Sequence, residues 1–219
     1  LPRKYISMTG LIVGSIAPDF EYFLRMKSKY SHTISGILWY DLPMGILLAF
    51  IFHNLIKEAL INNMPLFFQS RFLNLRDFNW NSYFKKNWYV VVVSIIIGIC
   101  SHILWDGFTH RTGHFVKMFS VLESSVKMFG QKIPVYRILQ HISTLLGGII
   151  VIKAIVNLPA DKTCVSKKGK YKYWIFLIVS TPIIMYVGLS KRIPYPSFWN
   201  LIVNFITAFL LSLVLTSFL

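Results

Sequence analysis

The residues from Ser101 to His110, Ser-His-Ile-Leu-Trp-Asp-Gly-Phe-Thr-His, carry the sharpest chemical signal in the sequence. His102 and Asp106 are one helical turn apart, so on a helix their side chains share one face. His110 joins them if the helix lasts one turn further. An imidazole and a carboxylate in this arrangement can both bind one cation, as in other helical metal motifs. The alternative is an ordinary hydrogen-bonded pair that helps helices to pack.

A second group of candidates lies near the start of the chain. Pro18 predicts the end of a short first helix, which leaves Asp19 in a loop. Asp19 is a candidate metal ligand, or else an N-cap, and His32 is a candidate ligand or a headgroup contact. Glu21, two residues from Asp19, is a candidate general base, with Asp19 as the alternative base.

Two further polar residues fall inside apolar segments. Asp41 would lie about 9 Å into the first spanning helix, at 1.5 Å per residue. There its carboxylate could accept a hydrogen bond from a metal-bound His102, or stay neutral and protonated, since burial disfavours the charged form. His141 is a candidate ligand, hydrogen-bond partner of the site or proton carrier. His53 is expected at the membrane interface.

Composition indicates which elements must position these residues. Of 219 residues, 55% are hydrophobic and only 14% are charged, well below the roughly 25% charged of a soluble domain. The formal net charge is +15, but the Lys and Arg residues lie between apolar runs. That placement favours anionic lipid headgroups over nucleic acid as partner. Two cysteines are too few for a disulfide scaffold.

The apolar runs have the length of membrane spans, about 17–25 residues. They are continuous instead of alternating, which favours helices over barrel strands. The sequence therefore predicts an all-α, polytopic transmembrane helical bundle of about five spanning helices plus a short N-terminal helix. The short helix covers Tyr5–Pro18, and the five spans are Ser35–His53, Trp88–Phe108, Val135–Leu158, Tyr173–Leu189 and Phe198 to the end. Loops are expected at 54–87 and at 109–134.

Alternation of the spans places the candidates on one face of the membrane. Asp19, Glu21 and His32 precede the first span, and the second span returns to that side with His102 and Asp106. Five of the six His residues fall on this face, and polar residues at membrane depth usually have a function. The Lys and Arg totals of the two sides are nearly equal, so they do not give the orientation.

These motifs, in this order, resemble a family of uncharacterised bacterial membrane proteins, a domain of unknown function related to the YdjM-like inner-membrane metal-dependent hydrolases. The resemblance covers roughly residues 1 to 150. The matching pieces are Gly14 to Phe23 with its Pro18-Asp19 pair, Tyr30-Ser31-His32-Thr33, Asp41-Leu42-Pro43, Ser101 to His110, and Gln140-His141 with Ser143-Thr144.

The resemblance implies a bacterial inner (plasma) membrane protein with Asp19, His32, His102 and Asp106 as metal ligands. Such relatives carry an early His near their N-terminus. Because this chain opens at Leu1, we expect that His to precede it. Residues 1–158 would form the family-like membrane domain, and residues 159–219 a basic loop and two more spans of the same structural unit.

The function expected first is a metal-dependent hydrolase. A divalent ion, Zn²⁺ before Mn²⁺ or Fe²⁺, would be held by the four ligands and His110. It would activate water against an ester or phosphoester of an amphiphile at the interface. The alternatives are a transporter or ion pathway using intramembrane His and Asp, and a non-catalytic scaffold. Membrane lipids and an amphiphilic small molecule are the expected partners, and the sequence does not specify the oligomeric state.

Overall fold

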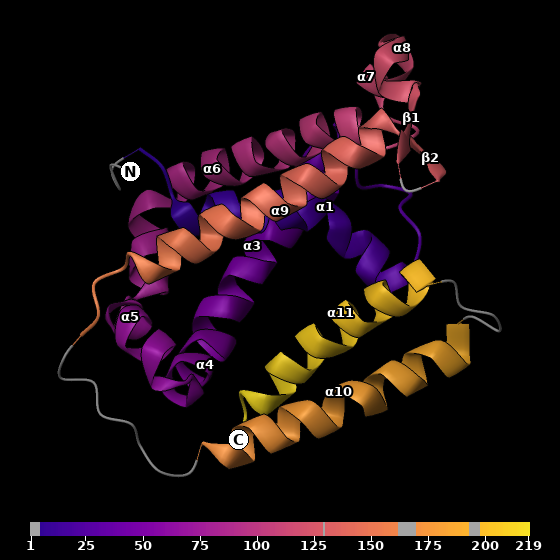
Figure 1. The fold of residues 1–219 in the computed structure, drawn as a ribbon. Helices are drawn as coiled ribbons and strands as arrows, with labels where there is room; N and C mark the ends of the chain where they lie inside the picture. Colours follow the sequence, from indigo (N-terminus) through magenta and orange to yellow (C-terminus); the bar gives the residue numbers. More distant parts are fainter. Residues whose placement is uncertain (1–4, 129, 162–169, 193–197) are drawn as a thin grey trace. The chain divides into compact units, whose positions relative to one another are not determined.

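The structure, a computed structural model, is mainly helical and describes residues 5–128, 130–161, 170–192 and 198–219 (Figure 1). It confirms the predicted all-α class, and two π-helical turns are labelled η. The elements in chain order are α1 (Met8–Arg25), α2 (Ile34–Gly36), η1 (Ile37–Asp41), α3 (Leu42–Ile51), η2 (Phe52–Ile56), α4 (Lys57–Asn63), α5 (Leu66–Arg76), α6 (Trp80–Thr109), α7 (His114–Met118), α8 (Ser120–Glu123), β1 (Ser125–Met128), β2 (Gln131–Pro134), α9 (Val135–Val156), α10 (Tyr171–Arg192) and α11 (Phe198–Thr216).

Five helical segments of the described chain are long and apolar enough to cross a membrane. They are Ile34–Asn63, Trp80–Met118, Val135–Val156, Tyr171–Leu189 and Phe198–Thr216. Each contains or closely matches one predicted span, so the chain is a membrane-embedded helical protein. The second predicted span began at Trp88, and the backbone of α6 is non-helical at Asn87, directly before it.

The chain forms two compact units. One comprises residues Leu1–Ile99 with Ala160–Leu219, and the other comprises Cys100–Pro159. The first unit contains α1 to α5, most of α6, and the two C-terminal helices. The second contains the last turns of α6, the short elements α7 to β2, and α9.

Small residues bring α1 and α6 together in the first unit. A Cβ on Gly14 would lie 2.2 Å from the Ile95 carbonyl oxygen, and one on Gly98 would lie 2.5 Å from that of Leu11. Only glycine allows two backbones to approach this closely. Gly10 meets Ser94 one turn earlier on both helices, so α1 and α6 run in the same direction.

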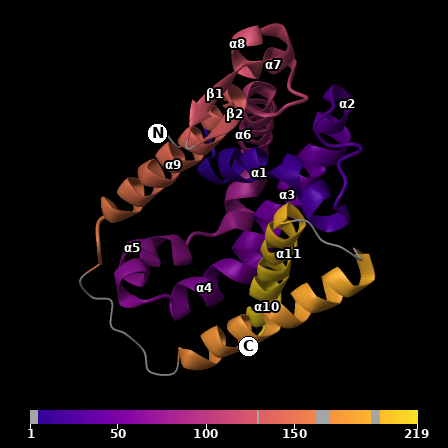
Figure 2. The same cartoon turned by 45° about the vertical axis from the view of Figure 1, so that its right-hand side comes forward.

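The two C-terminal helices, α10 and α11, lie side by side in both views (Figures 1 and 2). The Asn204 side chain donates to the Met185 carbonyl (2.9 Å) across this pair. Thr207 donates its hydroxyl to the Phe23 carbonyl (2.9 Å), which joins α11 to α1. Polar side chains therefore help to hold these apolar helices together.

In the second unit, the residues between α6 and α9 fold back on the end of α6. The Phe108 and Phe115 rings are stacked with centroids 4.1 Å apart. Strands β1 and β2 form an antiparallel hairpin in which Ser125 pairs with Pro134. The expected loop at 109–134 was wrong, because strands of four residues are too short to give a clear alternating pattern.

Two other expectations were also wrong. Pro18 lies inside α1 and does not end it. A proline inside a helix removes one backbone hydrogen bond, and burial of Ala17, Pro18 and Glu21 on the packed face of α1 compensates for that loss. Most of the expected loop at 54–87 is helical, in α4, α5 and the start of α6. Of the predicted basic loop, residues 162–169 lie outside the described residues.

Candidate metal centre

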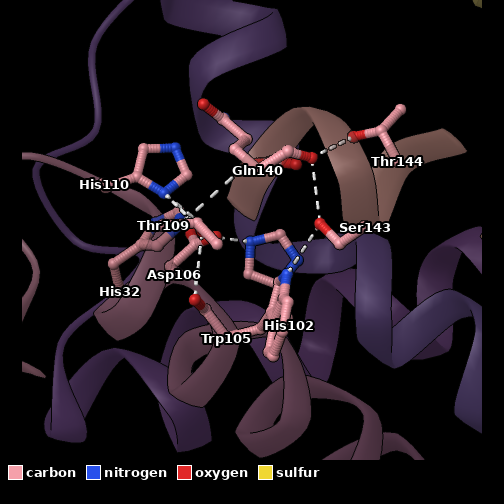
Figure 3. Close-up of polar contacts among 10 residues, drawn as sticks. His32, His102, Trp105, Asp106, Thr109, His110, Gln140, Ser143 and Thr144 are labelled. Atoms are coloured by element: carbon pink, nitrogen blue, oxygen red, sulfur yellow. Dashed lines mark hydrogen bonds and ion pairs between the residues drawn. The ribbon is translucent and has the colours of Figure 1, made fainter. Parts of the chain in front are cut away.

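Asp106 lies between two imidazoles near the C-terminal end of α6 (Figure 3). Its Oδ2 is 3.1 Å from Nε2 of His102, and its Oδ1 is 3.3 Å from Nδ1 of His110. The three residues follow one another by one helical turn, as predicted. The His102 side chain is 15% exposed and that of His110 is 50% exposed. The cluster is therefore most accessible at His110.

Backbone contacts keep His110 in helical register after α6 ends at Thr109. The His110 N–H donates to the Asp106 carbonyl (3.1 Å), and the Thr109 hydroxyl donates to the Trp105 carbonyl (3.0 Å). Gly113 then lets the chain turn across the helix end, because a Cβ there would lie 2.4 Å from the Gly107 carbonyl oxygen. The condition for His110 to join the cluster, a helix that lasts long enough, is met.

Helix α9 supports the same helix end through a contact that the sequence did not predict. The Trp105 indole N–H donates to the Ser143 hydroxyl (3.3 Å), which itself donates to the Gln140 carbonyl (2.9 Å) (Figure 3). Trp105 and Ser143 both stand within the motifs that carry the family resemblance. The family motifs were therefore the signal in the sequence that pointed to this contact. His141, the predicted hydrogen-bond partner of the site, is exposed on α9, and its role stays a prediction.

In the first unit, Asp19 and His32 form a second pair. Nε2 of His32 is 3.9 Å from Oδ1 of Asp19, and Nδ1 of His32 is hydrogen-bonded with the Ser31 hydroxyl (3.1 Å). His32 adopts φ 63°, a left-handed conformation that costs a non-glycine residue about 1–2 kcal/mol. Such backbone persists only where its surroundings hold it. Asp19 lies well inside α1, so the N-cap alternative was wrong.

Glu21 holds the segment that leads to His32. One carboxylate oxygen accepts hydrogen bonds from the backbone N–H groups of Lys29 (3.0 Å), Tyr30 (2.8 Å) and Ser31 (2.8 Å). The other accepts from Arg25 (3.1 Å). Burial alone would raise the pKa of Glu21, but these backbone hydrogen bonds outweigh it and hold the pKa below its usual value. Through these contacts Glu21 positions the segment before His32. Its predicted role as general base stays a prediction.

Asp41 and His53 each lie in a π-helical turn of the first spanning segment. Such turns often coincide with functional sites. The Asp41 side chain is fully buried. Nε2 of His53 is hydrogen-bonded with the Thr9 hydroxyl (3.0 Å), and the imidazole stacks on the buried Trp80 ring with centroids 4.5 Å apart. His53 thus packs within the first unit, and the predicted role of Asp41 stays a prediction.

The donor atoms of the α6 cluster are of the types that bind a divalent ion. Imidazole nitrogens and carboxylate oxygens are common zinc ligands, with bonds of about 2.0–2.2 Å. Two such ligands around a tetrahedral ion are about 3.3 Å apart. The separations of Asp106 from His102 and His110, 3.1 and 3.3 Å, run to different oxygens of the carboxylate and are those of imidazole–carboxylate hydrogen bonds. The distance of 3.9 Å between Oδ1 of Asp19 and Nε2 of His32 would have to shorten slightly for both atoms to bind one ion.

The chain belongs to the family described as a domain of unknown function (DUF4184), which matches residues 1–218. The match extends beyond the roughly 150 residues that the sequence motifs covered, and includes both C-terminal spans. No curated protein and no solved structure matches the chain.

Proposed function

We propose that this chain is a metal-dependent hydrolase of the bacterial inner membrane, acting on an ester or phosphoester of an amphiphile at the interface. The observation that carries the proposal is the Asp106 carboxylate held between two imidazoles near the end of a spanning helix. Ionisable groups in such segments are costly to maintain and usually functional. The resemblance to the YdjM-like hydrolases points to the same class of reaction.

The proposed ligands are Asp19, His32, His102 and Asp106, with His110 in addition. Asp19 and His32 offer one carboxylate and one imidazole, and His102, Asp106 and His110 offer one carboxylate and two imidazoles, donor types suited to a divalent ion. Helices α1 and α6 run in the same direction within the first unit, where Gly14 and Gly98 mark their close approach. Along its own helix His102 follows Gly98 by one turn, and the Pro18-Asp19 pair follows Gly14 by one turn. Alternation of the spans is the argument that both groups belong to one face of the membrane.

When bound, Zn²⁺, or Mn²⁺ or Fe²⁺ in its place, would supply Lewis acidity that polarises the scissile bond and lowers the pKa of water. The residues of the chain perform the remaining tasks. Asp106 orients the rings of His102 and His110, and Glu21 holds the segment that carries His32. Of the two candidate bases, Glu21 is buried and already accepts four hydrogen bonds. The Asp19 side chain is 46% exposed, so it could bind the ion through one carboxylate oxygen and take a proton from water through the other. Asp19 is the base in this proposal.

The test is the metal content of purified protein, with Asp106→Asn as the variant and Asp77→Asn as its matched control. Asp77 is an exposed carboxylate paired with Arg76 at the end of α5. We expect bound zinc in the wild type and in Asp77→Asn. Zinc affinity should fall at least tenfold in Asp106→Asn, because even partners of metal ligands contribute tenfold or more. Elemental analysis and competition with a chelator give both values.

A second measurement separates metal binding from hydrolysis. Wild-type protein loaded with zinc should cleave p-nitrophenyl butyrate or bis(p-nitrophenyl) phosphate in mixed micelles, and Asp106→Asn should not. Metal without hydrolysis of either probe would restrict the proposal to a metal-binding protein. Absence of bound metal, or unchanged content in Asp106→Asn, would remove it.

A transporter is the second candidate function, and the buried Asp41 within a π-helical turn of a span favours it. A carboxylate in this position suits a proton or cation relay. Proton or cation flux into liposomes that requires Asp41 and survives Asp106→Asn would support a transporter over the hydrolase.

A further inference from the structure

Helix α5 presents its side chains in the reverse of the order found on a water-soluble helix. Its polar residues Gln69 and Ser70 are buried, at 5% and 9% exposure. Phe67, Phe68 and Leu75 are exposed, at 47%, 39% and 47%. A helix on an aqueous surface buries its apolar face and exposes its polar face. The exposed side of α5 also carries Asn74, so it suits the boundary between an apolar medium and water.

The length and position of α5 place that boundary at the membrane surface. The helix has 11 residues, about 16 Å at 1.5 Å per residue, which is too short for the roughly 30 Å hydrocarbon core. It lies between one spanning segment, which ends at Asn63, and the next, which starts at Trp80. Both views show α5 beside the end of α4 (Figures 1 and 2).

The buried polar face of α5 is fixed to the protein, so the exposed face has a set orientation. Nζ of Lys170 donates to the Gln69 side chain and to the Met64 carbonyl, both at 2.7 Å. The Gln69 amide donates to the Asn62 carbonyl (3.1 Å). These bonds join the helix to the end of α4 and to the residue before α10. They leave Phe67, Phe68 and Leu75 directed outward.

Charge specifies the kind of surface. Residues 64–86 contain Arg71, Arg76, Lys85 and Lys86 against the single acidic residue Asp77. The Arg71 guanidinium lies 3.9 Å above the Phe67 ring centroid, so this cation is fixed beside the apolar patch. Cations next to exposed aromatic and leucine side chains match the phosphates and acyl boundary of an anionic lipid layer.

We propose that α5 is a lipid-binding surface that lies in the plane of the membrane interface. Phe67, Phe68 and Leu75 enter the acyl boundary, and Arg71 binds the phosphates of anionic lipids, whereas Arg76 is paired with Asp77. This surface is independent of the proposed metal centre.

The depth of α5 is tested with a nitroxide spin label on Phe68→Cys, in a full-length Cys100→Ser/Cys164→Ser background reconstituted into phosphatidylglycerol vesicles. The control label is Ser28→Cys, at an exposed polar residue between Lys27 and Lys29. We expect the label at position 68 to favour collisions with oxygen over a water-soluble nickel complex, and the label at position 28 to show the reverse. Nickel access at position 68 would overturn the proposal. Exclusion of both reagents would also overturn it, because a protein and not lipid would then cover α5.

The phosphate contacts are tested by titrating short-chain phosphatidylglycerol or phosphatidylcholine into delipidated protein in detergent. The variant is Arg71→Gln and the control is Lys117→Gln, an exposed lysine on α7. Each Arg near an anionic surface contributes about 1 kcal/mol, or about fivefold in affinity. We expect a loss of about fivefold for phosphatidylglycerol and little change for phosphatidylcholine. Equal binding of both lipids, or unchanged affinity in the variant, would contradict the assignment to phosphates.

Discussion

At the scale of single residues, Glu21 links the end of α1 to the position of His32. Three consecutive backbone N–H groups converge on one of its oxygens. They belong to the residues directly before His32, whose left-handed backbone needs such support. A buried carboxylate with this many donors stabilises the folded state while it remains ionised.

We expect Glu21→Gln to lower the free energy of unfolding by about 2 kcal/mol, because it removes the charge that the buried donors face. Thermal unfolding in detergent measures the change. Glu58→Gln is the matched control, since Glu58 is exposed in the first turn of α4 and should have little effect.

The pH dependence has a definite sign. The folded pKa of Glu21 lies below its ordinary value of 4.5, so its contribution is fully present above about pH 4.5 and is lost as the pH falls through the lower folded pKa. The wild type should lose more stability than Glu21→Gln below pH 4.5. Parallel pH curves for the two proteins would contradict this role.

The sequence predicted the contacts between residues that lie close together in the chain. His102, Asp106 and His110 follow the helical repeat, and their contacts are those that the spacing predicted. It could not find the contacts of Glu21, because its donors are backbone groups of a turn that has no periodic signal. Ser143 was also missed as a partner of Trp105, since the two residues are far apart in the chain.

At the scale of elements, the close approach of α1 and α6 depends on glycine. We expect Gly14→Ala to destabilise the protein by about 1–3 kcal/mol, because a Cβ would meet the Ile95 backbone and force the helices apart. Melting temperature in detergent measures the effect. The matched control is Gly147→Ala on α9, where nothing lies within 4 Å of the added Cβ. That change should be neutral or stabilising, because alanine favours helix.

Spanning helices were predicted well because their signal is length and apolarity, which the bilayer imposes on the sequence. The short elements were not. Pro18 alone predicts a helix end, but the packed face of α1 continues to Glu21 and decides the outcome. Helix α5 was expected as loop because its apolar residues are not gathered on one side of the helix, so it lacks the pattern of a helix that packs on a core.

At the scale of the whole molecule, five spans place the residues just before the first span and those just after the last on opposite sides of the membrane. Cysteines at Ser28, before the first span, and at Leu219, after the last, should therefore react from opposite sides. Asn79→Cys, at an exposed residue between the first two spans, should react from the same side as Leu219→Cys. A membrane-impermeant maleimide measures this in sealed vesicles of the Cys100→Ser/Cys164→Ser protein. Labelling of positions 28 and 219 from one side would contradict five crossings.

The bonds at the corner between α4 and α5 have a consequence for how the polypeptide could be divided. The Asp161 N–H donates to the Ser70 carbonyl (2.9 Å), and Lys170 is bonded to Met64 and Gln69. Asp161 and Lys170, which flank one connection, are thus attached to the same few residues. The entropy of closing a loop depends only weakly on its length. A protease that cut between them would leave two fragments still associated. A gene divided at that point could encode two separate polypeptides that assemble into the same protein.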